Sequence, residues 1–432
     1  MATEIAGPDQ KSGLRHNRDY WWFWFGQTIS ALGDDVFTVT LTLWIATVVV
    51  GDEPWAPLAV AGVLVAETVP IMLLSLVAGV YADRWNRRRI MLAADAVRCV
   101  LVAGLAVVVF IGPALPRGVV LAITWTVSAL VSAAAQFFGP ARFGMLGAVV
   151  DDADRERAAS IATGSTALTG IIGPSLGAVL LVVAGAQWAM LLNAASFAVS
   201  FFAVAKMRTG RGPAPPAAAA HAPFWRELME GFRYLAGNRM LKVLLITTTT
   251  VTAVTSCLAP LEVFFVTENL NGSPAVYGII ETAAGVGVLA GAAVTAIFVK
   301  PFRAASVYAY AIVASGVLLA CYSRMTTPLG AIVIMFVAGF PLAAQSSMTG
   351  PLMLRATPAQ LLGRVSTAFQ PINEIASLVT LSLAAWLASS VLRDLDATVL
   401  GVHLGPIDTI LLAAGVLTVL TGFAAAWAFR RA

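Results

Sequence analysis

The sequence has few charged residues, which make up 12% of its 432 residues. Soluble domains carry roughly 25% Asp, Glu, Lys and Arg, so this chain has about half the usual share. Hydrophobic residues make up 59%. This composition excludes a soluble enzyme and a disordered or fibrous protein, and it indicates a protein of the membrane.

Cysteine and histidine are also scarce, with three of each. Cys99, Cys257 and Cys321 lie in separate apolar stretches, too scattered to indicate a metal site or a disulfide framework. No G-x-x-x-x-G-K-[ST] phosphate-binding sequence is present. We therefore expect no enzyme activity, no metal, no cofactor and no ATP-driven step.

Long apolar runs are abundant. A membrane-spanning helix needs about 20 apolar residues, and twelve stretches meet this requirement. The prediction is an all-α polytopic membrane protein with little chain outside the spans. The predicted helices cover 21–49, 58–80, 90–111, 118–139, 160–184, 187–205, 240–266, 275–299, 304–322, 328–350, 365–389 and 405–429.

Lysine and arginine are distributed unevenly between the two sides of the predicted membrane. With the N-terminus inside, the inner segments carry 23 of the 27 Lys and Arg residues and the outer loops carry 3. Cytoplasmic loops carry such an excess, so both termini are predicted to be cytoplasmic. The net charge of +4 then follows the topology and does not indicate nucleic-acid binding.

The longest polar break, 206–239, divides the twelve helices into six and six. Its Pro- and Ala-rich part is typical of a linker. Its end, 224–235, has one apolar face and predicts an amphipathic helix on the inner membrane surface, or else a cytosolic extension of the next helix. The predicted organisation is a cytoplasmic N-terminus (1–20), a first bundle (21–205), the linker (206–239), a second bundle (240–429) and a tail (430–432).

A faint internal repeat relates the two halves. Ala66-Glu67-Thr68 in the second helix resembles Ile280-Glu281-Thr282 in the eighth. Ala134-Ala135-Gln136 in the fourth helix resembles Ala343-Ala344-Gln345 in the tenth. Parallel half-repeats are typical of transporters, in which the substrate site lies between the halves near the midplane of the membrane.

A sequence motif follows the second helix and consists of Gly79, Asp83, Arg84, Arg87 and Arg88. A positive-inside anchor would need only the arginines. Gly79 permits close helix contact, and Asp83 would cap a neighbouring helix N-terminus while Arg87 held it by a charge-assisted hydrogen bond. The stretch resembles the G-x-x-x-D-R-x-x-R-R signature of the major facilitator superfamily. The resemblance implies two pseudo-symmetric six-helix bundles and a conformational latch formed by these five residues.

A second motif lies in the fifth helix. It resembles the G-P-x-x-G-G part of the antiporter signature of drug-exporting branches, and it comprises Gly170, Gly173, Pro174 and Gly177. Thr169 and Ala178 depart from the signature. Small residues let this helix approach a neighbour closely, and Pro174 bends it. Ordinary helix packing is the alternative interpretation.

Five further segments are similar to the macrolide-efflux and siderophore-exporter group of the superfamily. They are Ser30–Asp34, Asp95–Arg98, Gly139–Arg142 after the fourth helix, Asp151–Arg157 and Leu362–Val365. One departure matters. Many drug–proton antiporters of the superfamily carry an arginine within the fourth helix, whereas this predicted helix has no charge before Arg142. A proton mechanism that relies on such an arginine is not supported.

Four carboxylates are predicted to lie deep in the membrane. Asp34 and Asp35 lie about 20 Å into the first helix at 1.5 Å per residue, and Glu67 and Glu374 are similarly deep. Charge at this depth is costly and indicates function, here substrate or proton binding. Neighbouring residues on a helix differ by about 100°, so we expect Asp34 to face the cavity and Asp35 a neighbouring helix, although the reverse stays open. Glu67 and Glu374 line the cavity or are hydrogen-bonded structural groups.

Four other charged residues fall near helix ends. Glu262 and Glu281 near the outer ends are candidates for an outer gate or a cation vestibule, or else exposed interfacial charges. Asp95 and Arg98 share one face of the third helix near its inner end. We interpret this pair as structural or as part of the latch, and not as substrate ligands.

The resemblance implies a secondary exporter of amphipathic or cationic organic molecules that works by alternating access and is driven by protons. Its expected partners are a small-molecule substrate, protons and membrane lipids, and a monomer in a bacterial plasma membrane is expected. A lipid or lysolipid flippase on the same fold is the main alternative. A non-transporting receptor or scaffold and an importer are further alternatives, and the substrate and the coupling ion stay open.

Overall fold

The apolar stretches form helices because lipid offers no partner to backbone N–H and C=O groups, which must bond within their own segment. The computed structural model describes residues 14–51, 53–111, 114–208, 224–298, 304–358, 361–395, 397–399 and 402–430. Within these ranges the side chains of 75–77, 79–84, 152, 224–228, 367, 397–399 and 402–403 are not described. The described chain contains 12 helices long and apolar enough to cross a membrane, which confirms the predicted number.

Six of these helices form the first half of the molecule. They are α1 (Arg18–Trp44), α2 (Ala56–Arg84), α3 (Arg87–Ile111), α4 (Arg117–Val149), α5 (Arg155–Val183) and α6 (Ala186–Lys206). Short 3-10 turns, Leu14–His16 and Asp152–Asp154, precede α1 and α5. Asn17 caps α1 by accepting a hydrogen bond from the Tyr20 backbone N–H, and this cap fixes where the first helix begins.

The second half contains one short helix, six long ones and a small hairpin. The helices are α7 (Phe224–Gly237), α8 (Arg239–Phe264), α9 (Pro274–Phe298), α10 (Ala304–Tyr322), α11 (Pro328–Ala356), α12 (Leu362–Trp386) and α13 (Pro406–Phe429). The antiparallel strands β1 (Ala397–Val399) and β2 (Val402–Leu404) pair Ala397 with Leu404. The sequence did not predict this hairpin.

Two predicted helix ends were wrong. The α4 helix continues through Pro140 to Val149, so Gly139–Arg142 lies inside the helix and not after it. The prediction ended where the apolar run ends, whereas the helix continues because Ala141, Met145 and Val149 are buried in a core shared with α1, α3 and α6. The α11 helix likewise continues through Pro351 to Ala356.

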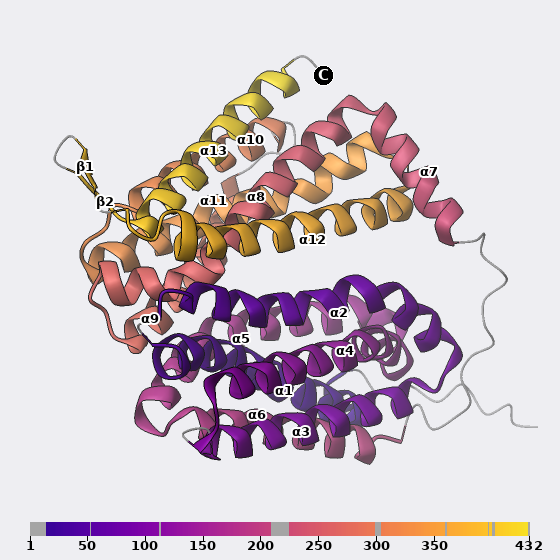
Figure 1. Ribbon diagram of the computed structural model, residues 1–432. Coiled ribbons are helices and arrows are strands. Elements are labelled where there is room, and N and C mark those ends of the chain that lie inside the picture. The colour runs from indigo at the N-terminus through magenta and orange to yellow at the C-terminus, as the bar shows by residue number, and fades with distance from the viewer. Residues whose placement is uncertain are drawn as a thin grey trace, which may run out of the picture.

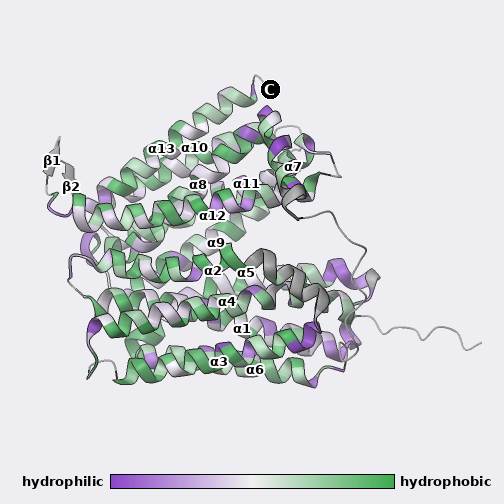
Figure 2. Ribbon diagram, turned by 45° about the vertical axis from the view of Figure 1, so that its right-hand side comes forward, coloured by the Kyte–Doolittle hydropathy of each residue, from purple (hydrophilic) through white to green (hydrophobic). Residues whose placement is uncertain are grey.

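The long helices form two bundles, which confirms the predicted fold class. In the first bundle α1 packs against α5 and α6, α3 against α4 and α6, and α2 against α4. In the second bundle α9 packs against α11, α10 against α11 and α13, and α8 against α12. Figure 1 shows the bundles one above the other, with α2 and α12 on their facing sides. Figure 2 shows apolar residues along the helices and polar residues concentrated near many of their ends.

The equivalent first helices of the bundles share an uncommon feature. A five-residue π-helical turn follows α1 (Ile45–Val49), and another follows α8 (Phe265–Asn269). A third such turn, Leu387–Val391, follows α12. π-Helical turns are rare, so their occurrence at the same place in α1 and α8 agrees with the internal repeat seen in the sequence.

The bundles share one hydrophobic core at one end of the molecule only. The "hairpin end" carries the β1–β2 hairpin, and the "termini end" is where α1 begins and α6 and α13 finish. A single core at the hairpin end joins both bundles and includes Phe37, Leu261 and Ala384. At the termini end the first bundle has its own core around Tyr20 and Met145. The second bundle has another around Tyr308 and Phe369, so among the described side chains the cores of the two halves merge at the hairpin end and are separate at the termini end.

Two helix pairs join the halves. Ala61, Leu64 and Val65 of α2 pack with Leu378, Leu381 and Ala385 of α12. On the other side α5 packs against α9. If the halves are exchanged, the second helix becomes the eighth and the fifth becomes the eleventh, so the α2–α12 and α5–α9 pairs are symmetry mates. We call them the two seals.

The short helix α7 is separate from α8. The break falls at Asn238, whose side chain accepts a hydrogen bond from the Leu241 backbone N–H and so caps α8. This cap contradicts the alternative in which 224–235 extends the next helix. The α7 helix packs against α12, where Glu230 pairs with Arg364 at 2.6 Å. Its predicted position on the membrane surface stays a prediction.

Candidate functional site

A buried ion cluster lies in the middle of the first bundle. The Arg98 Nη2 atom is 2.6 Å from Asp95 Oδ1, and Arg98 Nη1 is 3.9 Å from Asp34 Oδ2. The Arg98 and Asp95 side chains are 4% and 0% exposed, whereas Asp34 is 44% exposed. One arginine thus holds two carboxylates, of which only Asp34 is open to solvent.

Neighbouring helices hold this cluster in place. The Arg98 guanidinium lies 4.3 Å from the ring centres of both Phe138 (α4) and Phe197 (α6), so cation–π attraction stabilises it between two rings. Ser200 donates to Asp95 Oδ2 at 2.7 Å, and Gln27 donates to Ser200 at 3.2 Å. Four helices therefore fix the position of Arg98, and Asp34 is the cluster member that solvent reaches.

The predicted Asp95–Arg98 pair is present, but its predicted place near the helix end was wrong. Arg98 lies eleven residues into α3, or about 17 Å along the axis, which is mid-span. The sequence separates Asp34 from Arg98 by 64 positions and gave no sign of their contact. A mid-span arginine was the available signal, because such a charge needs a carboxylate partner on a neighbouring helix.

Asp34 and Asp35 point to different helices. Asp34 lies within reach of Arg98 on α3 and Asn193 on α6. Asp35 packs against Gly173 and is within hydrogen-bonding reach of Thr169, both on α5. The half-exposed Asp34 and the α5-facing Asp35 agree with the expected division of roles, which stays a prediction as far as function is concerned.

Glu67 and Glu374 lie just beyond the α2–α12 seal. Among the apolar residues of this seal, Val65 and Leu378 are the closest in sequence to the two glutamates. Glu67 follows Val65 by two residues, and its charge interacts with that of Asp34. Glu374 precedes Leu378 by one helical turn, and no described side chain forms a hydrogen bond or ion pair with it. Both glutamates are half-buried, so either side chain can accept a proton or a cationic group.

Glu262 and Glu281 form a second acidic site within the second bundle. Their carboxyl groups lie within hydrogen-bonding reach of each other, and that of Glu281 also reaches Tyr277. Tyr322 donates to Glu262 Oε1 at 3.1 Å. Glu262 is 2% exposed and Glu281 is half-buried, so the alternative of exposed interfacial charges was wrong. Both line a cavity of about 270 Å³ among α8 to α11 and α13.

The latch residues are only partly described. The side chains of Gly79, Asp83 and Arg84 lie outside the described residues. Arg87 donates to the Gly144 carbonyl of α4 at 3.2 Å. Arg88 donates to the carbonyls of Val204 and Ala205 at the end of α6. These bonds of Arg87 and Arg88 stay within the first bundle, so the described contacts include no latch between the halves.

The antiporter-like motif lies between α1 and α9. A Cβ on Gly177 would lie 2.8 Å from the Val36 carbonyl of α1, and Thr40 donates to the Gly177 carbonyl. On the opposite side Ser175 donates to the Gly278 carbonyl of α9 at 2.9 Å. A Cβ added at Gly170 would meet no other atom within 4 Å. Gly173 and Gly177 thus set the contact with α1, and the residues around Pro174 form the α5–α9 seal.

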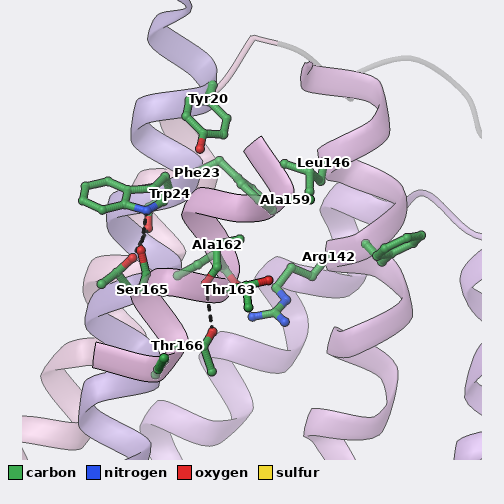
Figure 3. Close-up of a pocket in the computed structure, with 15 residues that line it drawn as sticks. Tyr20, Phe23, Trp24, Arg142, Leu146, Ala159, Ala162, Thr163, Ser165 and Thr166 are labelled. Carbon is green, nitrogen blue, oxygen red and sulfur yellow. Dashed lines mark hydrogen bonds between the residues drawn. The ribbon is translucent and has the colours of Figure 1, made fainter. Parts of the chain in front are cut away.

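A cavity of about 530 Å³ lies between α1, α4 and α5 (Figure 3). Its lining includes Tyr20, Phe23, Trp24 and Arg142. The sequence did not predict this cavity, because helices distant in sequence form its walls. In the described ranges no three His, Cys, Asp or Glu side chains are grouped as a metal site.

The chain resembles known transporters in both sequence and structure. A family model described as transmembrane secretion effector matches residues 12–388. The chain is 27% identical to the multidrug efflux pump Tap of Mycobacterium tuberculosis over 239 residues, which are 53% of the chain and 54% of Tap. It is 26% identical to BacE of Bacillus subtilis, named as a proposed bacilysin exporter, over 43% of each chain. The match thus spans about half the length of these relatives.

Solved structures show the same fold. A crystal structure of a bacterial homologue of the iron transporter ferroportin, in an inward-facing state, superimposes with a TM-score of 0.74 at 14% identity. The superposition covers 96% of this chain and 99% of that one. The nucleoside transporter NupG gives a TM-score of 0.71 at 12% identity, over 95% of this chain and 99% of NupG.

Proposed function

The chain belongs to the transmembrane secretion effector family of the major facilitator superfamily, whose members are transporters and not enzymes, and on this premise we propose that it is a proton-coupled exporter of amphipathic organic molecules. The observation that carries the proposal is Asp34, a half-exposed carboxylate bound to a buried arginine in the middle of the first bundle. The name of the relative Tap, a multidrug efflux pump, favours drug-like substrates.

Competition for one carboxylate gives a simple coupling mechanism. Asp95 neutralises Arg98 at 2.6 Å, whereas Asp34 lies farther away at 3.9 Å. The negative charge of Asp34 is therefore incompletely satisfied, and either a proton or a cationic substrate group stabilises it. Because one carboxylate holds only one of the two at a time, proton entry displaces the substrate. Glu67, whose charge interacts with that of Asp34, serves as a second acceptor.

Alternating access follows from the two seals. In this structure the halves share a core at the hairpin end and have separate cores at the termini end. We infer from the predicted inner excess of Lys and Arg that the termini end faces the cytoplasm, and from the bacterial relatives that the membrane is a bacterial plasma membrane. The shared core then joins the halves on the outer side, and their separate cores lie on the cytoplasmic side, from which an exporter loads. We assign Arg87 and Arg88, with Gly79, Asp83 and Arg84, to a latch that forms when this end closes.

The second acidic site is assigned to the outer gate. Glu262 and Glu281 lie in the half of the second bundle that belongs to the shared hairpin-end core, together with Tyr277 and Tyr322. When the outer side opens, the shared core separates and these groups meet water. The relatives Tap and BacE are named as a multidrug efflux pump and a proposed bacilysin exporter, which favours export of small organic molecules over the flippase alternative.

The test is transport in inside-out membrane vesicles with an imposed pH gradient. Ethidium uptake is followed by fluorescence for wild type, Asp34→Asn, Glu67→Gln and the control Asp394→Asn, which removes an exposed carboxylate outside the helices. We expect gradient-driven uptake by wild type and the control, and a loss of about tenfold or more in Asp34→Asn. Normal uptake by Asp34→Asn at equal expression would refute the assigned coupling site.

A further inference from the structure

The cavity between α1, α4 and α5 carries an unbalanced positive charge. Arg142 of α4 is the charged residue of its lining. Among the described residues, Arg142 has no hydrogen-bond or ion-pair partner. The charged group that acts on it is Arg98, which repels it and is itself held by Asp34 and Asp95. Asp34 and Asp95 are thus paired with Arg98, and no described carboxylate pairs with Arg142.

A buried hydroxyl group points into the same cavity. Tyr20 is 1% exposed, and its hydroxyl has no hydrogen-bond partner among the described residues. Figure 3 shows this hydroxyl directed toward the other side chains of the lining, with Arg142 on the neighbouring wall. An unpaired buried hydroxyl is costly. The cavity therefore offers two separate donors, the Tyr20 hydroxyl and the Arg142 guanidinium, with Phe23 and Ala159 between them in Figure 3.

Three other polar side chains of the walls already have hydrogen-bond partners. Trp24 Nε1 donates to Ser165 Oγ at 2.8 Å, and Ser165 donates to the Ile161 carbonyl at 2.8 Å. Thr166 donates to the Ala162 carbonyl. The rings of Phe23 and Trp24 complete a largely apolar wall. A volume of about 530 Å³ lies within the roughly 300–1,000 Å³ typical of small-molecule sites.

We propose that this cavity binds the transported molecule, with its acidic group on Arg142, its apolar part against the aromatic wall and the Tyr20 hydroxyl as donor to a second polar group. The inference rests on the proposed export function and names its substrate class. Ala31 also lines the cavity and lies three residues before Asp34. A molecule bound here therefore ends within one helical turn of Asp34, and a zwitterionic aromatic compound satisfies both sites. The competing interpretation is that Arg142 only anchors α4 at the membrane surface.

The test measures binding to purified protein in an uncharged detergent, without any gradient. Two probes share one ring and one chain: pyrenebutyrate carries a carboxylate and pyrenebutanol a hydroxyl group. Binding is followed by energy transfer from tryptophan to pyrene. The variants are Arg142→Gln, Arg142→Lys and Tyr20→Phe, and the control Arg393→Gln removes an exposed arginine at the hairpin end.

We expect wild type and Arg393→Gln to bind pyrenebutyrate about tenfold more tightly than pyrenebutanol, because charge-assisted hydrogen bonds are roughly twice as strong as neutral ones. Arg142→Gln should remove this preference and Arg142→Lys should keep part of it, whereas Tyr20→Phe should leave it unchanged, because the Tyr20 hydroxyl lies away from Arg142.

Equal binding of both probes by wild type, or a preference that persists in Arg142→Gln, would overturn the proposal. Either result would favour the interpretation that Arg142 only anchors α4 at the membrane surface. The two proposals can fail separately. Carboxylate-selective binding without gradient-driven transport would refute the export function and keep the site. Ethidium transport without carboxylate preference would refute the site alone.

Discussion

At the scale of single residues, Arg98 organises the polar interior of the first bundle. Its guanidinium group contacts two carboxylates and two aromatic rings. One of the carboxylates lies on the same helix as Arg98, and the other three groups lie on three different helices. A buried charge is tolerated only with such partners, because its desolvation is costly. Removing Arg98 leaves Asp95, which is 0% exposed, without a counter-charge.

We therefore predict that Arg98→Gln destabilises the protein by about 3–5 kcal/mol, the usual cost of removing one partner of a buried ion pair. The matched control is Arg117→Gln, which breaks the exposed pair with Glu53 at 2.8 Å and should cost about 0–1 kcal/mol. Thermal unfolding in detergent measures both. The double variant Arg98→Gln/Asp95→Asn should recover part of the loss, and a wild-type melting profile for Arg98→Gln would contradict the role given to the cluster.

At the scale of helices, glycines decide how closely the seals pack. A Cβ on Gly278 of α9 would lie 2.7 Å from the Cβ of Ala178 and 2.9 Å from the Pro174 carbonyl of α5. Either distance is shorter than van der Waals contact. A larger residue at position 278 must push α9 away from α5, and this separates the halves at the hairpin end.

Gly278→Val should therefore shift the protein away from the state sealed at the hairpin end. Overpacking costs about 1–3 kcal/mol, and since 1.4 kcal/mol is a factor of about ten in an equilibrium constant, the shift should be about tenfold. Spin labels at Val183 of α5 and Ile279 of α9, both exposed, should then report longer distances.

The matched control for this change is Gly170→Val on α5. A Cβ at this position meets nothing within 4 Å, so the label distances and transport should stay close to those of wild type. If Gly278→Val and Gly170→Val gave the same distances, close packing of α5 on α9 would not control the seal.

At the scale of the whole molecule, the proposed alternating access requires the two bundles to separate at the hairpin end. Ala61 of α2 and Ala385 of α12 are 3% and 0% exposed and belong to the same cluster between the halves. A covalent link there would hold the α2–α12 seal closed while each bundle stays intact.

Cysteines at positions 61 and 385, joined by a short bifunctional thiol reagent with a reducible bond, should stop transport, and a reductant should restore it. The background would have Cys99, Cys257 and Cys321 replaced, since none of these three forms a disulfide. Each single-cysteine protein treated in the same way serves as a control. Transport that continues in the fully cross-linked protein would rule out alternating access through this seal.

Composition and apolar run length determined much of this protein. They gave the number of helices, because lipid permits few other backbone structures, and the Lys and Arg pattern and the repeat indicated two halves. They placed Asp34, Asp35, Glu67 and Glu374 at membrane depth. The predicted fourth helix was too short, because the length of the apolar run does not indicate that residues beyond the run are also packed and helical.

The tertiary structure alone decided which of these residues meet. The contact of Asp34 with Arg98, the Glu262–Glu281 pair and the cavity of Tyr20 and Arg142 each join helices far apart in the sequence. Residue spacing fixes the face of one helix, whereas a contact between two helices also depends on their rotation and separation. Close-packing residues such as Gly177 and Gly278 set that rotation and separation, and their effect appears only once the helices are assembled.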